Sequence, residues 1–137
     1  MIRLSVLLLA AAAPAAAQVA PISFEAGKLL PQTPGQWSYA VSVNGSEARY
    51  GAAFSIRCDR ATRTVIISRP GAPPTVLTIA TDSTTRSLPM GGRLLANDPI
   101  LDAIAFSRGR FIVLGGGATL AIPSWPEAAR SIEDCRS

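Results

Sequence analysis

The fold of this chain depends on the stretch SWPEAARSIEDC, residues 124–135, near the C-terminus. Ser124 and Glu127 match a capping box, in which the serine hydroxyl accepts the N3 amide and the glutamate returns to the N-cap amide. Apolar residues then recur at helical spacing on one face, namely Trp125, Ala128, Ala129, Ile132 and Cys135. We predict a short terminal helix that packs on a sheet, is covalently tied to it, and points Trp125 and Cys135 inward.

The first 17 residues have the pattern of a secretory signal peptide. Arg3 gives a positive start, residues 4–13 form an apolar core, and residues 15–17 are small, as at a cleavage site. The apolar run is shorter than the roughly 20 residues that a membrane span needs. We predict a signal peptide over residues 1–17, cleaved before Gln18 or a few residues later. The protein is then periplasmic or secreted, and has no membrane partner after cleavage.

The mature chain suits one domain with a modest core. Removal of residues 1–17 from the 137-residue chain leaves 120 residues, and the composition is 48% hydrophobic and 16% charged. The formal net charge is +4, and about +3 without Arg3. Because the charge is mild and the chain carries an export signal, we expect no nucleic-acid partner.

The two cysteines, Cys58 and Cys135, are predicted to form a disulfide, because an even count in an exported protein favours pairing. Cys58 follows Phe54 and Ile56 at a period of two, so it faces the core. The chain-entropy model gives roughly 4–5 kcal/mol for so long a loop. A redox or metal site is disfavoured, since the chain has no C-x-x-C pair and no histidine. We expect no metal and no cofactor.

Short strands separated by turn residues fill the rest of the chain. Residues 37–43 alternate apolar and polar, and Asn44-Gly45 is a strong hairpin signal because both residues tolerate positive φ. Further strands are predicted at residues 47–50, 52–58, 64–68, 75–80, 85–88, 110–114 and 118–122. The predicted fold class is mainly β, a small antiparallel sandwich or open barrel of about seven strands with one short internal helix and a C-terminal helix.

The internal helix and the N-terminal arm complete the predicted domain organisation. Asp98 can cap a short helix, Pro99 suits its first position, and Gly109 suits its C′ position. Residues 18–35 contain three prolines and little periodicity, so we predict an extended N-terminal arm in which residues 23–30 could form a turn of helix. Residues 36–137 are predicted to form a single disulfide-tied β-rich domain.

The sequence offers few residues for catalysis. The absence of histidine excludes Ser-His-Asp and Cys-His systems, and a Ser-Lys dyad would have to use Lys28 in the arm. Asp98 and Asp102 lie four apart and could form a carboxylate pair. A helix cap and a solvated face are the preferred interpretation, so no catalytic residue and no enzyme activity are expected.

Two arginines around a tight turn are candidate binding residues, Arg108 and Arg110. Arginine at such a turn can fork onto a carboxylate or phosphate. The alternative is that one of them satisfies helix-terminal carbonyls or pairs with Asp98, Asp102 or Asp134.

Two resemblances add to this interpretation. The segments DPILDAIAFSRGRF (98–111) and IPSWPEAARSIEDCR (122–136) resemble those of uncharacterised small exported proteins of Gram-negative bacteria, alphaproteobacteria especially, which implies no particular activity. Residues 46–50, SEARY, resemble the Ser-Gly-x-x-Tyr stretch of exported C-type lysozyme inhibitors, which are small β-barrels with a terminal disulfide. Glu47 replaces the glycine, and the stretch precedes the first cysteine. The resemblance marks Arg49 and Tyr50 as further candidate binding residues.

The function expected first is an exported, non-enzymatic domain that binds a protein or a cell-envelope component. The alternative is an inhibitor of a secreted hydrolase, a lysozyme or a protease, acting through residues 44–50, residues 70–74 or the arm. An enzyme of unknown type is third. If Trp125 fills the core, its replacement by alanine should cost about 3–5 kcal/mol.

Overall fold

The computed structural model describes residues 10–11 and 23–137. Apart from residues 10 and 11, the predicted signal peptide lies outside the described residues, as do the first five residues of the predicted arm. Among the helices of the described residues, none is long and apolar enough to cross a membrane.

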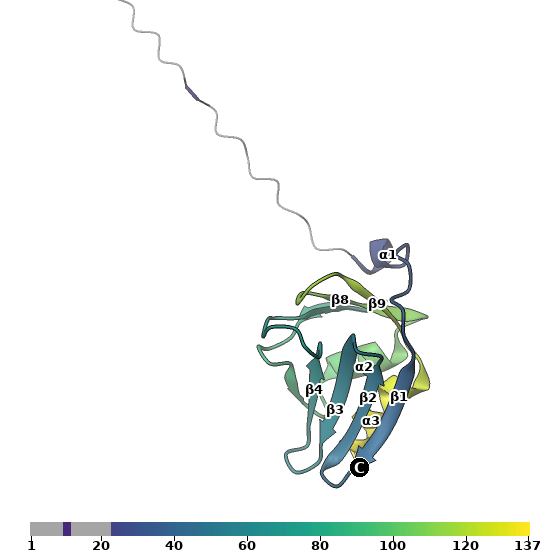
Figure 1. Cartoon of the computed structure of the whole chain (residues 1–137). Coiled ribbons are helices and arrows are strands. Elements are labelled where there is room, and N and C mark those ends of the chain that lie inside the picture. The colour runs from purple at the N-terminus through teal and green to yellow at the C-terminus, as the bar shows by residue number, and fades with distance from the viewer. Residues whose placement is uncertain (1–9, 12–22) are drawn as a thin grey trace, which may run out of the picture.

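Two antiparallel sheets face each other, and the terminal helix lies against the lower one in Figure 1. Sheet A has the order β1 (Trp37–Ser42), β2 (Gly45–Tyr50), β3 (Phe54–Asp59), β4 (Thr64–Ser68) and β7 (Arg93–Leu95). Sheet B has the order β6 (Thr85–Ser87), β5 (Thr78–Ala80), β8 (Arg110–Leu114) and β9 (Leu120–Pro123). The predicted mainly β, antiparallel two-sheet fold is confirmed, and the sheets do not close into a barrel.

The described residues form nine strands, where the sequence predicted about seven. Strand β7 was not predicted, because a pairing of only three residues leaves no detectable alternation. The first hairpin turns at residues 43–44 and not at Asn44-Gly45, and neither Asn44 nor Gly45 has a positive φ. Gly45 is instead the first residue of β2, where a Cβ would collide with the Cys58 carbonyl oxygen. This glycine serves close backbone approach rather than turn geometry.

An aromatic cluster joins the two sheets. Phe54 of sheet A and Phe111 of sheet B are fully buried, with ring centroids 5.4 Å apart. Trp37 and Tyr50 extend the cluster within sheet A. The internal helix α2 (Pro99–Phe106) closes the same core with three buried residues, Ile100, Leu101 and Ile104.

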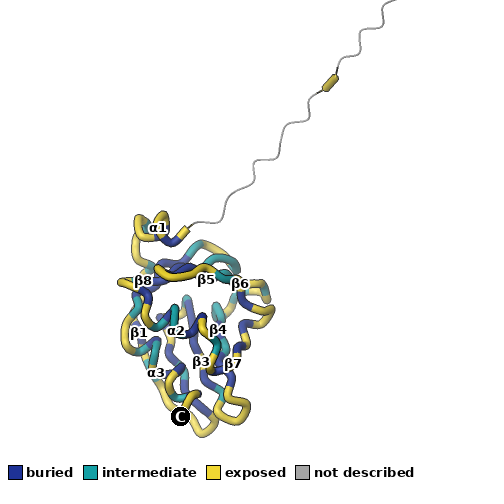
Figure 2. The backbone as a smooth tube through the Cα atoms, turned by 180° about the vertical axis from the view of Figure 1, so that it is seen from behind, coloured by how far each residue is buried: buried dark blue, intermediate teal, exposed yellow. Residues whose placement is uncertain are grey.

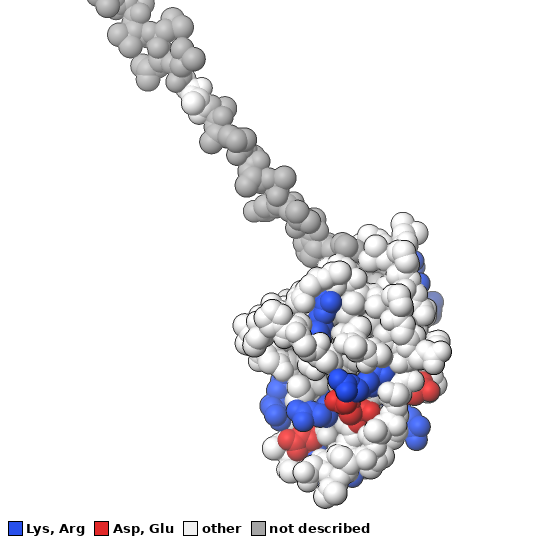
Figure 3. Space-filling model, viewed as in Figure 1, with Lys and Arg blue, Asp and Glu red and all other residues white. Residues whose placement is uncertain are grey.

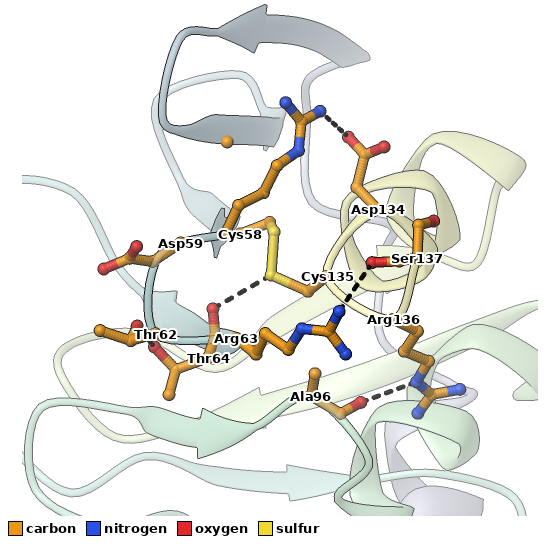
Figure 4. Close-up of a disulfide and its surroundings, with 12 residues drawn as sticks. Cys58, Asp59, Thr62, Arg63, Thr64, Ala96, Asp134, Cys135, Arg136 and Ser137 are labelled. Carbon is orange, nitrogen blue, oxygen red and sulfur yellow. Dashed lines mark hydrogen bonds and ion pairs between the residues drawn. A yellow bond between two sulfur atoms is a disulfide. The ribbon is translucent and has the colours of Figure 1, made fainter.

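The terminal helix α3 (Pro126–Asp134) packs across β1, β2 and β3, with Ala128 and Ile132 buried. The predicted disulfide is present: Cys58 of β3 joins Cys135 at the end of α3, with a Cα–Cα distance of 5.5 Å (Figure 4). Both cysteines are buried. The prediction that the terminal helix closes the sheet face that carries Cys58 is therefore confirmed.

The predicted start of this helix is wrong. The N-cap is Trp125, without a side-chain cap, so Ser124 and Glu127 do not form a capping box. The backbone amide of Ser124 is bonded to the Gly109 carbonyl at 3.1 Å, which keeps Ser124 at the end of the β8–β9 ladder. Pro126 then opens the helix, because its ring suits the first position. Trp125 consequently has extended backbone angles and is 46% exposed, so it does not fill the core.

The internal helix starts as predicted and ends earlier than predicted. The Asp98 carboxylate accepts the Ile100 amide at 2.9 Å, and Pro99 takes the first position. The helix ends at Phe106 with Ser107 as C-cap, so Gly109 lies one position beyond C′. The Ser107 hydroxyl donates to the Arg110 carbonyl at 2.6 Å, which turns the chain directly into β8.

The described part of the predicted arm, residues 23–35, is packed against sheet B. It contains the short helix α1 (Phe24–Gly27), whose Phe24 covers Ile112 and Ala121 in a second, smaller core. The Thr33 amide donates to the Ala121 carbonyl at 3.0 Å, so the arm also pairs with the free edge of β9. Residues 23–35 therefore cover the face of sheet B that carries Ile112 and Ala121.

Candidate functional site

The structure places the four predicted binding residues in different surroundings. Tyr50 is fully buried and its hydroxyl donates to a carbonyl of the arm at 2.6 Å, so it offers no surface. Arg110 donates to the Leu30 carbonyl at 2.7 Å and holds the arm. Charged side chains of both signs lie across the outer face of sheet A (Figure 3), where Arg49 pairs with Glu47 at 3.3 Å. Arg108 alone of the four lines a groove.

The groove lies between α2 and the turn that joins β5 to β6, and it has a volume of about 670 Å³. One wall is a face of α2 that repeats at helical spacing, made by Pro99, Asp102, Ala103 and Phe106. The other wall is residues 82–84 together with Arg86 of β6. Figure 2 shows this side of the molecule, with β6 at the margin of the upper sheet and α2 below it.

One ion pair ties the two walls of the groove together. Arg86 binds both carboxylate oxygens of Asp98, at 2.7 and 2.8 Å. This hydrogen bonding from Arg86, aided by the Ile100 amide, holds the pKa of Asp98 below its usual range, although partial burial opposes the effect. Asp98 is therefore ionised at neutral pH and ties β6 to the start of α2.

The two carboxylates that line the groove, Asp102 and Asp82, differ in how closely they contact an arginine. Asp102 accepts a hydrogen bond from Arg136 at 2.7 Å. Arg108 is 93% exposed, and its ion pair with Asp82 is long, at 3.8 Å. Two residues away the ring of Phe106 is 79% exposed. The groove therefore presents a guanidinium with spare donors beside an uncovered aromatic ring.

One of the two alternatives considered for the arginines is not observed. We predicted that Arg108 or Arg110 could pair with Asp98, Asp102 or Asp134, but these carboxylates bind Arg86, Arg136 and Arg60, respectively. The alternative that an arginine satisfies backbone carbonyls holds for Arg110, although those carbonyls belong to the arm and not to α2.

The Asp98–Asp102 pair has no geometry suited to general acid catalysis. Each carboxylate has its own arginine, and the pKa of Asp98 is lowered, whereas a general acid needs a raised pKa. Within residues 10–11 and 23–137, no cluster of three or more His, Cys, Asp or Glu side chains could hold a metal ion.

Sequence reasoning missed Phe106, Arg86 and Asp82. A signal for Phe106 was present, because helical spacing places it with Pro99 and Ala103, opposite the apolar stripe of Leu101 and Ile104. An aromatic residue on the solvent face of a helix is a reasonable candidate for contact with a partner. The contribution of Arg86 depends on how β6 packs beside α2, which no local pattern specifies.

We expect Asp98→Asn to lower the free energy of unfolding by about 1 kcal/mol at pH 7, because it removes the ion pair but keeps an amide cap, and solvent screens the half-exposed Arg86. The pKa of Asp98 is lowered in the folded state, so its contribution is present above about pH 4 and is lost as pH falls through the folded value. Urea unfolding near pH 7 measures the loss of stability caused by Asp98→Asn, and urea unfolding near pH 2 shows whether that loss decreases at low pH.

The control is Asp102→Asn, which should cost less than about 0.5 kcal/mol since its carboxylate is more exposed. An Asp98→Asn loss of equal size at both pH values would contradict the assignment to the carboxylate charge.

The fold and the groove define a class of protein, a small two-sheet β domain tied by one disulfide, with an open groove of mixed charge beside its internal helix. No protein-family model, no curated protein and no solved structure matches this chain. The function is therefore argued from the groove itself.

Proposed function

We propose that the protein is an exported, non-enzymatic domain that binds a segment of a partner protein in the groove between α2 and the β5–β6 turn. A carboxylate of the partner pairs with Arg108, and an apolar side chain covers Phe106. The observation that carries the proposal is the joint exposure of these two side chains, 93% and 79%, at one groove.

The chemistry of the two side chains supports a protein partner. Arginine and aromatic residues are enriched among the residues that dominate protein–protein binding energy. Burial of a phenylalanine side chain contributes roughly 1.5–3 kcal/mol relative to its exposed state. Because Phe106 is exposed in this domain, a partner that covers it would gain this free energy. The Arg108 fork matches the two oxygens of a carboxylate, and its long contact with Asp82 leaves donors free.

The disulfide supports export. A buried disulfide is typical of proteins that work in an oxidising compartment, and the predicted signal peptide leads to the same compartment. A periplasmic or secreted location follows as part of the proposal. The engagement of Asp98 and Asp102 with Arg86 and Arg136 favours binding over catalysis, because neither carboxylate is held ready for proton transfer.

The test is a titration of the labelled mature domain, residues 18–137, with the peptide acetyl-TVEFTV-amide, followed by NMR. Saturable shifts are expected at residues 82–86 and 99–108. Arg108→Gln and Phe106→Ala should each weaken binding by about fivefold or more, as expected for loss of about 1 kcal/mol. Arg57→Gln, at an exposed arginine on the outer face of sheet A, is the matched control and should change nothing.

The peptide supplies its own control, since replacement of its glutamate by glutamine should also weaken binding. Shifts that never saturate, or an affinity that ignores Arg108, would overturn the proposal.

An inhibitor of a secreted hydrolase is the second candidate. Residues 45–50 form β2 and are hydrogen-bonded to strands on both sides, so they do not project as a loop. The loop at residues 70–74 does offer exposed prolines, Pro73 and Pro74. Inhibition of lysozyme or of a secreted protease that disappears when this loop is replaced by glycine and serine would favour this candidate.

A further inference from the structure

Strand β6 is an edge strand of sheet B, with β5 as its partner. Two hydrogen bonds bracket their pairing: the Thr81 amide donates to the Thr84 carbonyl and the Leu88 amide donates to the Leu77 carbonyl, both at 2.8 Å. In an antiparallel pair, successive residues alternate between facing the partner and facing away.

The alternation determines which backbone groups of β6 are free. Between the two bracketing bonds, Arg86 faces β5, so the amides and carbonyls of Thr85 and Ser87 point away from the sheet. Both residues are exposed. The edge therefore presents donors and acceptors in the spacing that one further strand would use.

This free edge borders the groove. Arg86 extends from β6 to Asp98 at the start of α2, so the inner side of β6 is the groove side. A strand added to β6 would alternate its side chains between solvent and the face of α2 that carries Ala103 and Phe106. Figure 2 shows β6 at the margin of the upper sheet, with α2 in the layer below that sheet.

We propose that the partner segment binds as an extended strand, which pairs with Thr85 and Ser87 of β6 and places alternate side chains in the groove. One of these side chains is a glutamate or aspartate that meets Arg108. The inference rests on the proposed function and specifies its mode: backbone pairing supplies the alignment, and Arg108 with Phe106 supplies the selectivity.

Charge complementarity favours a foreign acidic peptide over a second copy of this chain. A second copy paired through its own β6 would bring another Arg108, while both of its groove carboxylates already have arginine partners: Asp102 binds Arg136, and Asp82 contacts its own Arg108. A peptide with an unpaired carboxylate meets the spare donors of Arg108 directly. The short edge strand also resists pairing by itself, so binding depends on the anchors in the groove.

The test compares backbone-modified forms of acetyl-TVEFTV-amide on the mature domain. N-methylation of one alternating set of peptide amides should raise Kd about tenfold or more, and methylation of the other set should change it less than about twofold, since only one set can face β6. Ser87→Pro removes the outward amide of β6 and should also raise Kd about tenfold, whereas Ser87→Ala keeps the amide and should leave Kd unchanged.

The outcomes separate this inference from the proposed function. Binding that depends on Arg108 but is insensitive to both methylation sets and to Ser87→Pro overturns strand addition and leaves groove binding in place. Failure of the unmodified peptide to bind the domain overturns both strand addition and groove binding. Dimers that form with rising concentration and disappear in Ser87→Pro would assign the edge to a second copy and overturn the peptide partner. If the Ser87→Pro variant does not fold, the methylated peptides still test strand addition on the unchanged domain.

Discussion

Replacement of both cysteines, by Cys58→Ala with Cys135→Ala, is expected to lower the free energy of unfolding by about 4 kcal/mol. The two residues are 77 positions apart, so the bond removes a large loop-closure entropy from the unfolded chain. Both side chains are almost fully buried, and alanine at each site leaves no unpaired hydroxyl in the core. Urea unfolding of the mature domain, with and without the two cysteines, measures the difference.

The native arrangement of α3 should survive this change. Ile132 and Ala128 keep the helix on sheet A, and Arg136 still donates to the Ala96 carbonyl at 2.7 Å. We therefore expect the amide spectrum to change only near the two sites, and the denaturant slope to rise, because an uncrosslinked unfolded chain exposes more surface. A loss below about 1 kcal/mol, or shifts throughout α3, would contradict an effect exerted through the unfolded state.

Local periodicity was sufficient for the interior of the terminal helix and insufficient for its start. Ile132 and Cys135 share a face at helical spacing, and the even number of cysteines predicted the bond between Cys135 and Cys58. Trp125 matches the same spacing but precedes the helix, because Ser124 remains bonded to the β8–β9 ladder. The large cost expected for loss of Trp125 from the core therefore no longer applies.

The groove shows the same division between local and tertiary information. Arg108 was identifiable from its turn, and the cap at Asp98 from the residues around it. The bond between Arg86 and Asp98 joins a strand to a helix through the packing of the two layers, so the sequence order does not indicate it. Tyr50 was selected from a resemblance, whereas its pairing with Trp37 and Phe54 in sheet A directs the ring inward.

Phe54→Ala is expected to cost about 3–5 kcal/mol in the free energy of unfolding, because it opens a cavity between the two sheets. Phe54 is fully buried and contacts the rings of Trp37 in its own sheet and Phe111 in the other. Its loss removes the ring that links the sheets, and the disulfide cannot compensate, since it ties α3 to sheet A alone. Urea unfolding with the disulfide intact keeps even a weakened domain measurable.

The matched control is Phe106→Ala, the same substitution at a ring that is 79% exposed, with an expected change within about 0.5 kcal/mol. The pair separates the two uses of phenylalanine in this chain, one for the core and one for the groove. Phe54→Ala should destabilise the domain, whereas Phe106→Ala should weaken peptide binding in a domain of unchanged stability. Equal losses of stability in the two variants would mean that the groove ring supports the fold, and the argument from its exposure to a partner would fail.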